Sequence, residues 1–284
     1  MVPGMAFALV AMVCFGAADL VYKRAAAQGV AARHFLMVQA WFFSPAVTLY
    51  AIATGTLEFN AAAWWGALAG FVAFVGFYNF ARSLSTGSVS RNAPIFRLNF
   101  TLTVALAVVI LGERLTPAKL LGLVLAFAAV WLLLGEGNRD APASRVDRAS
   151  LALVLLATVA MGVANFVYKM GVHDGASPGT VLACQAFVFM PLATLVVFVA
   201  DRSIRPPRAA WLTAPLAALL LGVGFVFLLS GLALGPASTL VPVAQMGFVV
   251  TALMGTVLFG ETLSARKIAG LVAALAALGA LAIG

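Results

Sequence analysis

Apolar residues run along the chain in blocks of about twenty, separated by short polar connections. The blocks cover residues 3–22, 34–54, 62–83, 89–111, 117–135, 150–169, 179–200, 210–232, 237–259 and 264–283. A helix needs roughly 20 apolar residues to cross the hydrocarbon core of a bilayer. The pattern therefore predicts an all-α membrane protein with ten transmembrane helices, which we number as spans 1 to 10.

The composition supports this interpretation. Of the 284 residues, 64% are hydrophobic and only 9% are charged, and the mean hydropathy is +1.09. Soluble chains carry about a quarter charged residues. The sequence has no CxxC, HExxH, phosphate-binding loop or GxSxG motif, so we predict no enzymatic activity, no metal, no cofactor and no nucleic-acid partner. The expected partners are the lipid bilayer and a small-molecule substrate.

The ten spans form two copies of one five-span unit. "LGERLTPAKLLGLV" at 111–124 and "FGETLSARKIAGLV" at 259–272 agree at seven of fourteen positions. Residues recur 146 positions later in the first part of each copy and 148 later in the second part: Tyr22 and Tyr168, Gln39 and Gln185, Pro94 and Pro242, Glu113 and Glu261. We predict repeats at 1–137 and 150–284, joined by a cytoplasmic linker at 138–149.

The two copies are predicted to lie in opposite senses, because five is an odd number of crossings. The connections after spans 1, 3, 5, 7 and 9 hold fourteen of the 17 Lys and Arg residues, and those after spans 2, 4, 6 and 8 hold three. Basic connections stay on the cytoplasmic side of a membrane. Both termini should therefore lie outside the cytoplasm. Inverted repeats are typical of secondary transporters that bind substrate between the halves.

The chain resembles the ten-helix EamA-type branch of the drug/metabolite transporter superfamily over nearly its whole length. The residues that carry the likeness recur in both copies: Gly112-Glu113 with Thr116 and Gly122, and Gly260-Glu261 with Ser264 and Gly270. The aromatic-rich pattern is most similar to bacterial exporters of aromatic and other neutral amino acids. The resemblance implies a multi-pass exporter of amino acids or similar small metabolites in the bacterial inner membrane, working by alternating access.

Polar side chains inside the spans are the candidates for substrate binding, because each is costly against lipid. Arg91 and Arg97 would attract a carboxylate through the donor fork of the guanidinium, unless they extend to the cytoplasmic interface. The other candidates either line a cavity or serve helix packing: Gln39, Tyr78, Asn79, Asn99, Gln185, Gln245 and Met246. Spans 5 and 10 are expected to brace the bundle or to form a homo-oligomer contact.

Two prolines are predicted hinges. Pro94 and Pro242 occupy matching places in spans 4 and 9. Each removes a helix hydrogen bond and frees the carbonyl four residues earlier, at Ser90 and Ser238. The alternative is a static kink that aids packing.

Asp19 is the one acid well inside an apolar block, and Asn165 replaces it in the second copy. It is either a proton-coupling carboxylate or, as we favour, the partner of Lys23 one helical turn later. A titrating Asp19 would suit the main alternative function, a proton-coupled multidrug antiporter. A second alternative is a lipid-translocating or scaffold protein without solute flux. For Glu113 and Glu261, turn or cap roles suffice.

The inverted topology predicts that the connections after spans 1 and 6 lie on opposite sides of the membrane. Single cysteines replacing Gln28 and Asp174, in a background with both native cysteines removed, should react with an impermeant thiol reagent from opposite sides. Reaction of both from the same side of sealed vesicles would rule out the inverted arrangement.

Overall fold

The computed structural model describes residues 2–58, 60–86, 92, 95–133, 145–259 and 264–283. Regular structure in these residues is helical. The helices are α1 (Met5–Ala27), α2 (Ala32–Ala53), α3 (Ala63–Thr86), α5 (Asn99–Leu111), α6 (Pro117–Leu133), α7 (Arg145–His173), α8 (Pro178–Asp201), α9 (Arg208–Leu234), α10 (Ala237–Gln245), α11 (Gly247–Phe259) and α12 (Ala265–Ile283).

These helices confirm the predicted ten-span fold. Among the described residues, seven helices are long and apolar enough to cross a membrane, and three apolar stretches are shorter: Ile95–Leu111, Pro117–Leu132 and Ala237–Thr251. In chain order the ten correspond to spans 1 to 10. The helix of span 6 is longer than its apolar block at 150–169, because it begins in polar residues before the block, such as Arg148, and continues beyond the block to His173.

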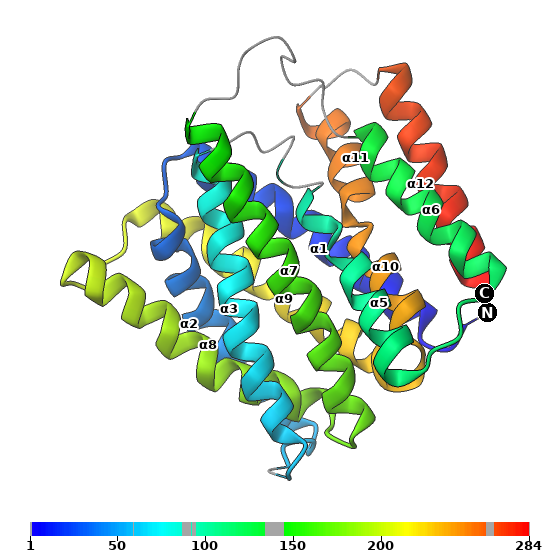
Figure 1. Cartoon of the computed structure of the whole chain (residues 1–284). Helices are drawn as coiled ribbons and strands as arrows, with labels where there is room; N and C mark the ends of the chain where they lie inside the picture. The colour runs from blue at the N-terminus through cyan, green and yellow to red at the C-terminus, as the bar shows by residue number, and fades with distance from the viewer. Residues whose placement is uncertain are drawn as a thin grey trace.

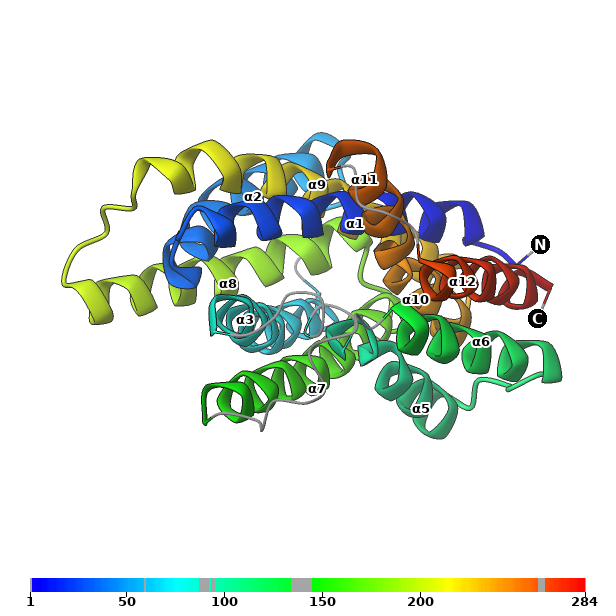
Figure 2. The ribbon, with the colours of Figure 1, turned by 90° about the horizontal axis from the view of Figure 1, so that it is seen from above.

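The two copies are interleaved rather than side by side. Helix α1 packs on α9, and its counterpart α7 packs on α3; likewise α2 packs on α9 while α8 packs on α3. The remaining large contacts pair equivalent helices, α2 with α8 and α6 with α12. Figures 1 and 2 both place α6 and α12 side by side at one edge of the bundle, away from α2 and α8. Exchange of the two copies therefore leaves the packing scheme unchanged.

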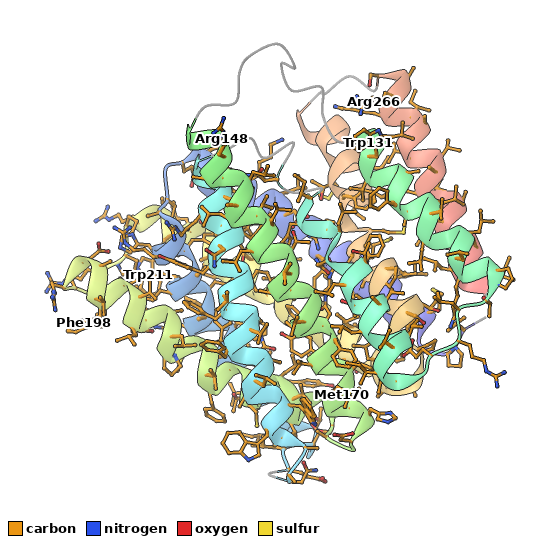
Figure 3. All side chains as sticks on the ribbon, viewed as in Figure 1. Trp131, Arg148, Met170, Phe198, Trp211 and Arg266 are labelled. Atoms are coloured by element: carbon orange, nitrogen blue, oxygen red, sulfur yellow. The ribbon has the colours of Figure 1, made fainter. Side chains whose placement is uncertain are left out.

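The connections lie at the two ends of the bundle in the arrangement that a repeat with an odd number of spans requires. At one end, the side chain of Arg33 in the first turn of α2 forms an ion pair with Asp201 at the end of α8, and Arg266 Nη2 donates to the carbonyl of Trp131 at 3.0 Å. Figure 3 shows Trp131, Arg148 and Arg266 toward that end and Met170 toward the other.

At the opposite end, the connections after spans 2 and 6 meet. The backbone N–H of Glu58 donates to Thr180 Oγ1 at 2.9 Å, and Trp65 Nε1 donates to Asp174 Oδ2 at 2.7 Å. The chain termini lie close together in Figures 1 and 2. The connection after span 1 thus lies at one end of the bundle and its equivalent after span 6 lies at the other. This is the geometry of an inverted repeat.

Glycines on α3 bring its backbone against α8, as expected for small residues four positions apart. A Cβ placed on Gly66 would lie 2.5 Å from the carbonyl oxygen of Val181, and one on Gly70 would lie 2.5 Å from that of Gln185. On the face of α3 toward α7, Gly76 has more room: its nearest neighbour would be the backbone nitrogen of Met161 at 3.4 Å.

Alanine in place of Gly70 and alanine in place of Gly76 should have opposite effects on stability. Gly70→Ala forces the backbones of α3 and α8 apart, which should cost about 1–3 kcal/mol. Gly76→Ala fits and adds up to ~1 kcal/mol of helix propensity. Thermal unfolding of the purified protein in detergent, followed by size-exclusion chromatography, measures the difference. Equal midpoints for the two variants would contradict the close approach of α3 and α8.

Candidate functional site

Spans 4 and 9 are both interrupted, and the interruptions are equivalent. The N–H of Leu98 donates to Ile95 O at 3.0 Å and that of Thr101 to Leu98 O at 3.0 Å. The N–H of Met246 donates to Val243 O at 3.1 Å and that of Val249 to Met246 O at 2.9 Å. These bonds reach back three residues instead of four, which tightens the helix locally. Leu98 and Met246 are 148 positions apart, so each copy breaks its fourth helix at the same place.

Each break rests on the first helix of the other copy. A Cβ on Gly16 of α1 would lie 2.3 Å from Gly247 O, and one on Gly162 of α7 would lie 2.8 Å from Asn99 O. Thr251 Oγ1 donates to Gly16 O, and Thr103 Oγ1 donates to Gly162 O, both at 2.9 Å. These two sets of contacts are related by the repeat. The absence of a Cβ at the glycines lets the broken backbones meet their neighbours directly.

Arg97, just before the first break, is the centre of the polar contacts between the copies. Its side chain is buried, with 5% of its surface exposed. Nη2 lies 2.5 Å from Asp19 Oδ2 of α1 and 3.5 Å from Phe15 O. Nη1 donates to Gln245 Oε1 at 2.9 Å. Gln245 is the residue that matches Arg97 in the second copy, so the two equivalent side chains touch each other.

Two asparagines extend this network to α7. Asn99 Nδ2 donates to Phe96 O at 2.7 Å and approaches Gln245 Oε1 at 3.4 Å. Asn165 Nδ2 donates to Asn99 Oδ1 at 3.0 Å. Asn165 matches Asp19, so the polar network joins both members of each equivalent pair. The ion pair that the structure gives Asp19 is with Arg97, whereas the sequence favoured a local partner, Lys23.

A small cavity opens beside this ion pair. The space open to water centres is about 20 Å³, enough for a water molecule but not for a larger ligand. Its polar lining comes from Asp19, Tyr22, Arg97 and Gln245, and its apolar lining consists of Phe15, Ala18, Phe77, Phe80, Phe96, Met161, Leu221 and Phe225. Of the sequence candidates, Arg97, Gln245 and Asp19 meet here.

A second small cavity adjoins the first and contains the two matched glutamines. It is lined by Gln39, Ala40, Phe43, Phe77, Gln185, Phe189, Leu221 and Phe225. Three of these residues also line the first cavity: Phe77, Leu221 and Phe225. Tyr22 Oη donates to Gln39 Oε1 at 2.5 Å, which links the polar groups of both cavities. The two spaces are therefore neighbouring compartments between the copies, here called the charged compartment and the glutamine compartment.

Other candidates lie elsewhere. Asn79 Nδ2 donates to Val75 O of its own helix at 2.8 Å. The ring of Tyr78 stacks on that of Phe74, and the guanidinium of Arg82 lies over the Tyr78 ring in a cation–π contact. Met246 is fully buried at the second break.

Of the predicted hinge residues, Pro242 lies inside α10 one turn before the break, and Ser238 lies at the start of that helix. Arg91, Ser90, Pro94 and Glu261 lie outside the described residues.

Several site residues escaped the sequence analysis. The phenylalanines of the two compartments come from six different helical segments, and nothing in their local pattern separates them from ordinary packing residues. The sequence distinguishes Tyr22 only through its place in the repeat. Its recurrence together with Gln39 at a fixed offset was the available signal, because matched polar residues in two inverted copies approach the same central axis.

At the end opposite Arg33 and Asp201, two charged side chains bind the backbone between the end of α9 and the start of α10, Glu113 from the first copy and Lys169 from the second. Glu113 accepts hydrogen bonds from the backbone N–H groups of Ala237 and Ser238, both at 2.8 Å. It thereby caps α10, whose N-terminus attracts negative charge. Lys169 Nζ donates to the carbonyls of Leu232 and Gly235, both at 2.8 Å. Glu113 thus serves as a cap, for a helix of the other copy.

Comparison with known proteins gives a family and a fold. The model of the EamA-like transporter family matches residues 2–135 and 148–283. A solved structure described as "Crystal structure of protein" is 16% identical, with a TM-score of 0.80 over 99% of this chain and 96% of the other. At that identity the likeness shows the fold alone. No curated protein matches the chain.

Removal of Asp19 should destabilise the protein through the charge that remains on Arg97. Asp19→Leu leaves a buried, uncompensated guanidinium and should cost about 3–5 kcal/mol, whereas Asp19→Leu combined with Arg97→Met should recover most of that loss. The partly exposed pair of Arg33 and Asp201 provides the control, since Asp201→Leu should cost about 1 kcal/mol or less. Unfolding in mixed detergent measures all four proteins. A double variant as unstable as Asp19→Leu would contradict the assignment.

Proposed function

The chain belongs to the EamA-like transporter family and is a membrane transporter of small molecules, and we propose that it exports amino acids, aromatic and other neutral ones preferred, or similar small zwitterions. In this proposal the substrate crosses between the two copies by alternating access. The observation that supports it most directly is the Asp19–Arg97 ion pair at the wall of a cavity between the copies.

The ion pair offers one partner for each charge of a zwitterion. The guanidinium of Arg97 has the planar donor fork that suits a carboxylate, and the carboxylate of Asp19 accepts from an ammonium group. A zwitterion that inserts between them leaves every buried charge with a partner. A ligand that carries only one charge leaves either Asp19 or Arg97 unmatched, which is costly in a buried site. The site therefore selects for both charges together.

The walls of the charged compartment favour an uncharged side chain. Rings from five phenylalanines form most of its apolar lining: Phe15, Phe77, Phe80, Phe96 and Phe225. The rings of Phe80 and Phe96 are stacked with centroids 4.0 Å apart. Aromatic ligands gain both buried area and ring contacts in such surroundings. Beyond Asp19 and Arg97, no other charged residue of the described chain lines this compartment, so a further cationic or anionic group on the substrate would have no ionic partner.

Alternating access requires one closed end and one accessible end. We assign the end closed by Glu113 and Lys169 to the outside, because its connections carry few basic residues. At the other end, a pocket of about 630 Å³ is lined by residues that include Lys23, Arg33, Tyr78 and Arg82. It shares Ala26, Val30, Ala32 and Leu84 with a small pocket that Tyr22 also lines. On this proposal, substrate enters from the cytoplasm past Tyr22.

A proton-coupled multidrug antiporter is the competing function, since Asp19 is the acid that lines the central cavity in the described chain. Uptake of labelled amino acids into proteoliposomes, with and without a proton gradient, separates the two. Amino-acid flux without a gradient supports the proposal. A strict requirement for the gradient, lost in Asp19→Asn while cationic drugs are the preferred substrates, supports the antiporter. Absence of solute flux across the panel would favour the lipid-translocating or scaffold alternative and reject both.

Each charge of the substrate should depend on one residue. In the wild type, an amino-acid amide and an N-acetyl amino acid should each compete with labelled substrate at least about tenfold less well than the free amino acid, which corresponds to 1.4 kcal/mol. Arg97→Gln should abolish the preference for acid over amide. Asp19→Asn should abolish the preference for free over acetylated amine. Because each result is a ratio within one variant, a general loss of transport does not produce it. Equal loss of both preferences in Arg97→Gln would remove Arg97 from carboxylate binding.

A further inference from the structure

The glutamine compartment contains a buried hydrogen-bond acceptor without a donor. Gln185 has 2% of its surface exposed, and its Oε1 accepts no hydrogen bond from the residues that the structure describes. Its matched residue Gln39 is satisfied, because Tyr22 donates to it. The equivalent bond from Tyr168 to Gln185 is not made: Tyr168 Oη is also without a partner in the described chain. Buried polar groups are nearly always paired, and exceptions occur at functional sites.

The surroundings of Gln185 in this compartment define what could satisfy it. Apart from Gln39, the lining consists of hydrocarbon and of the phenyl rings of Phe43, Phe77, Phe189 and Phe225. These rings meet edge to face: Phe77 and Phe189 at 69°, Phe77 and Phe225 at 77°, and Phe43 and Phe225 at 87°. A flat ring with an N–H or O–H group matches such walls and supplies the missing donor. No charged residue lines the compartment among the described residues, so a charged group is excluded.

The position of the compartment connects it with the ion pair. Phe77, Leu221 and Phe225 separate the two compartments and line both. A ligand whose ammonium and carboxylate bind Asp19 and Arg97 would direct its side chain across these three residues. The glutamine compartment has a volume of only about 10 Å³. A ring can therefore enter it only when the side chains of Phe77, Leu221 and Phe225 move. Motion between the copies, as alternating access requires, provides that movement.

Resting on the proposed function, we infer that Gln185 selects the side chain of the substrate. The glutamine compartment takes a planar side chain that donates one hydrogen bond to Gln185 Oε1, namely an indole or a phenol. Tryptophan and tyrosine are then better ligands than phenylalanine, which has the ring but no donor. Gln39 contributes surface only, because its oxygen already accepts from Tyr22.

The test compares two ligands that differ only in the donor. In 3-benzothienylalanine a sulfur replaces the indole N–H of tryptophan at nearly the same size. Competition with labelled substrate in proteoliposomes should show wild type binding tryptophan about tenfold more tightly than 3-benzothienylalanine. In Gln185→Met this ratio should fall to about one, while the affinity for 3-benzothienylalanine stays within about twofold of wild type. That retained affinity also shows that the variant is folded.

The matched variant Gln39→Met is the control. It removes an amide of the same size from the equivalent position, and it should keep the tenfold preference for tryptophan even if both ligands bind less well. A wild-type ratio near one, or an equal fall in Gln39→Met and Gln185→Met, would overturn the role of Gln185 while leaving amino-acid transport intact. Failure of every amino acid to compete would instead reject the proposed function.

Discussion

The buried charge of Arg97 is the constraint around which the centre of the protein is organised. A guanidinium removed from water needs an opposite charge and hydrogen-bond acceptors, and a single missing partner is expensive. Asp19 supplies the charge, and Gln245 and the carbonyl of Phe15 supply acceptors. These partners come from α1 and α10, so they are present together only when the two copies are assembled. The full set of partners for this one side chain therefore requires both copies.

The divergence of the two copies follows from the same constraint. Arg97 and Gln245 are equivalent residues in contact at 2.9 Å. An exact repeat would place a second guanidinium against the first, and the repulsion would separate the copies. The second copy has an amide in place of the guanidinium and, at position 165, an amide in place of the carboxylate of Asp19. The two replacements together leave the centre neutral. Sequence symmetry is thus lost where symmetric side chains would have to touch, and it is kept at Gly16, Gly162, Thr103 and Thr251, where the contacts are symmetric.

The sequence was sufficient for the architecture but not for the centre of the site. Span number and repeat follow from local hydropathy and sequence repetition; α6 begins at Pro117, as predicted, and α8 begins at Pro178, one residue before the predicted boundary. The break at Met246 lies one turn beyond Pro242. The backbone bends where Gly247 and Thr251 contact Gly16 rather than at the proline itself. The partner of Asp19 could not be read from spacing, since Arg97 reaches it only through packing of helices from distant parts of the chain. For Asn79 the sequence left cavity lining and helix packing open, and in the structure its amide donates to Val75 O within its own helix.

The symmetric breaks provide a physical link between substrate binding and motion. A ligand shifts a conformational equilibrium only by as much as its affinities for the two states differ. Arg97 and Gln245 each stand directly before a break, and their hydrogen bond connects the two interrupted helices. On the proposed function, a substrate carboxylate competes with Gln245 for the guanidinium and so weakens the direct bond between the breaks. The helices are tightened at these points by bonds that reach back three residues, and at Gly16 and Gly162 the backbone of each break lies directly against the neighbouring helix. Occupancy of the charged compartment would therefore act at the positions where spans 4 and 9 bend most easily.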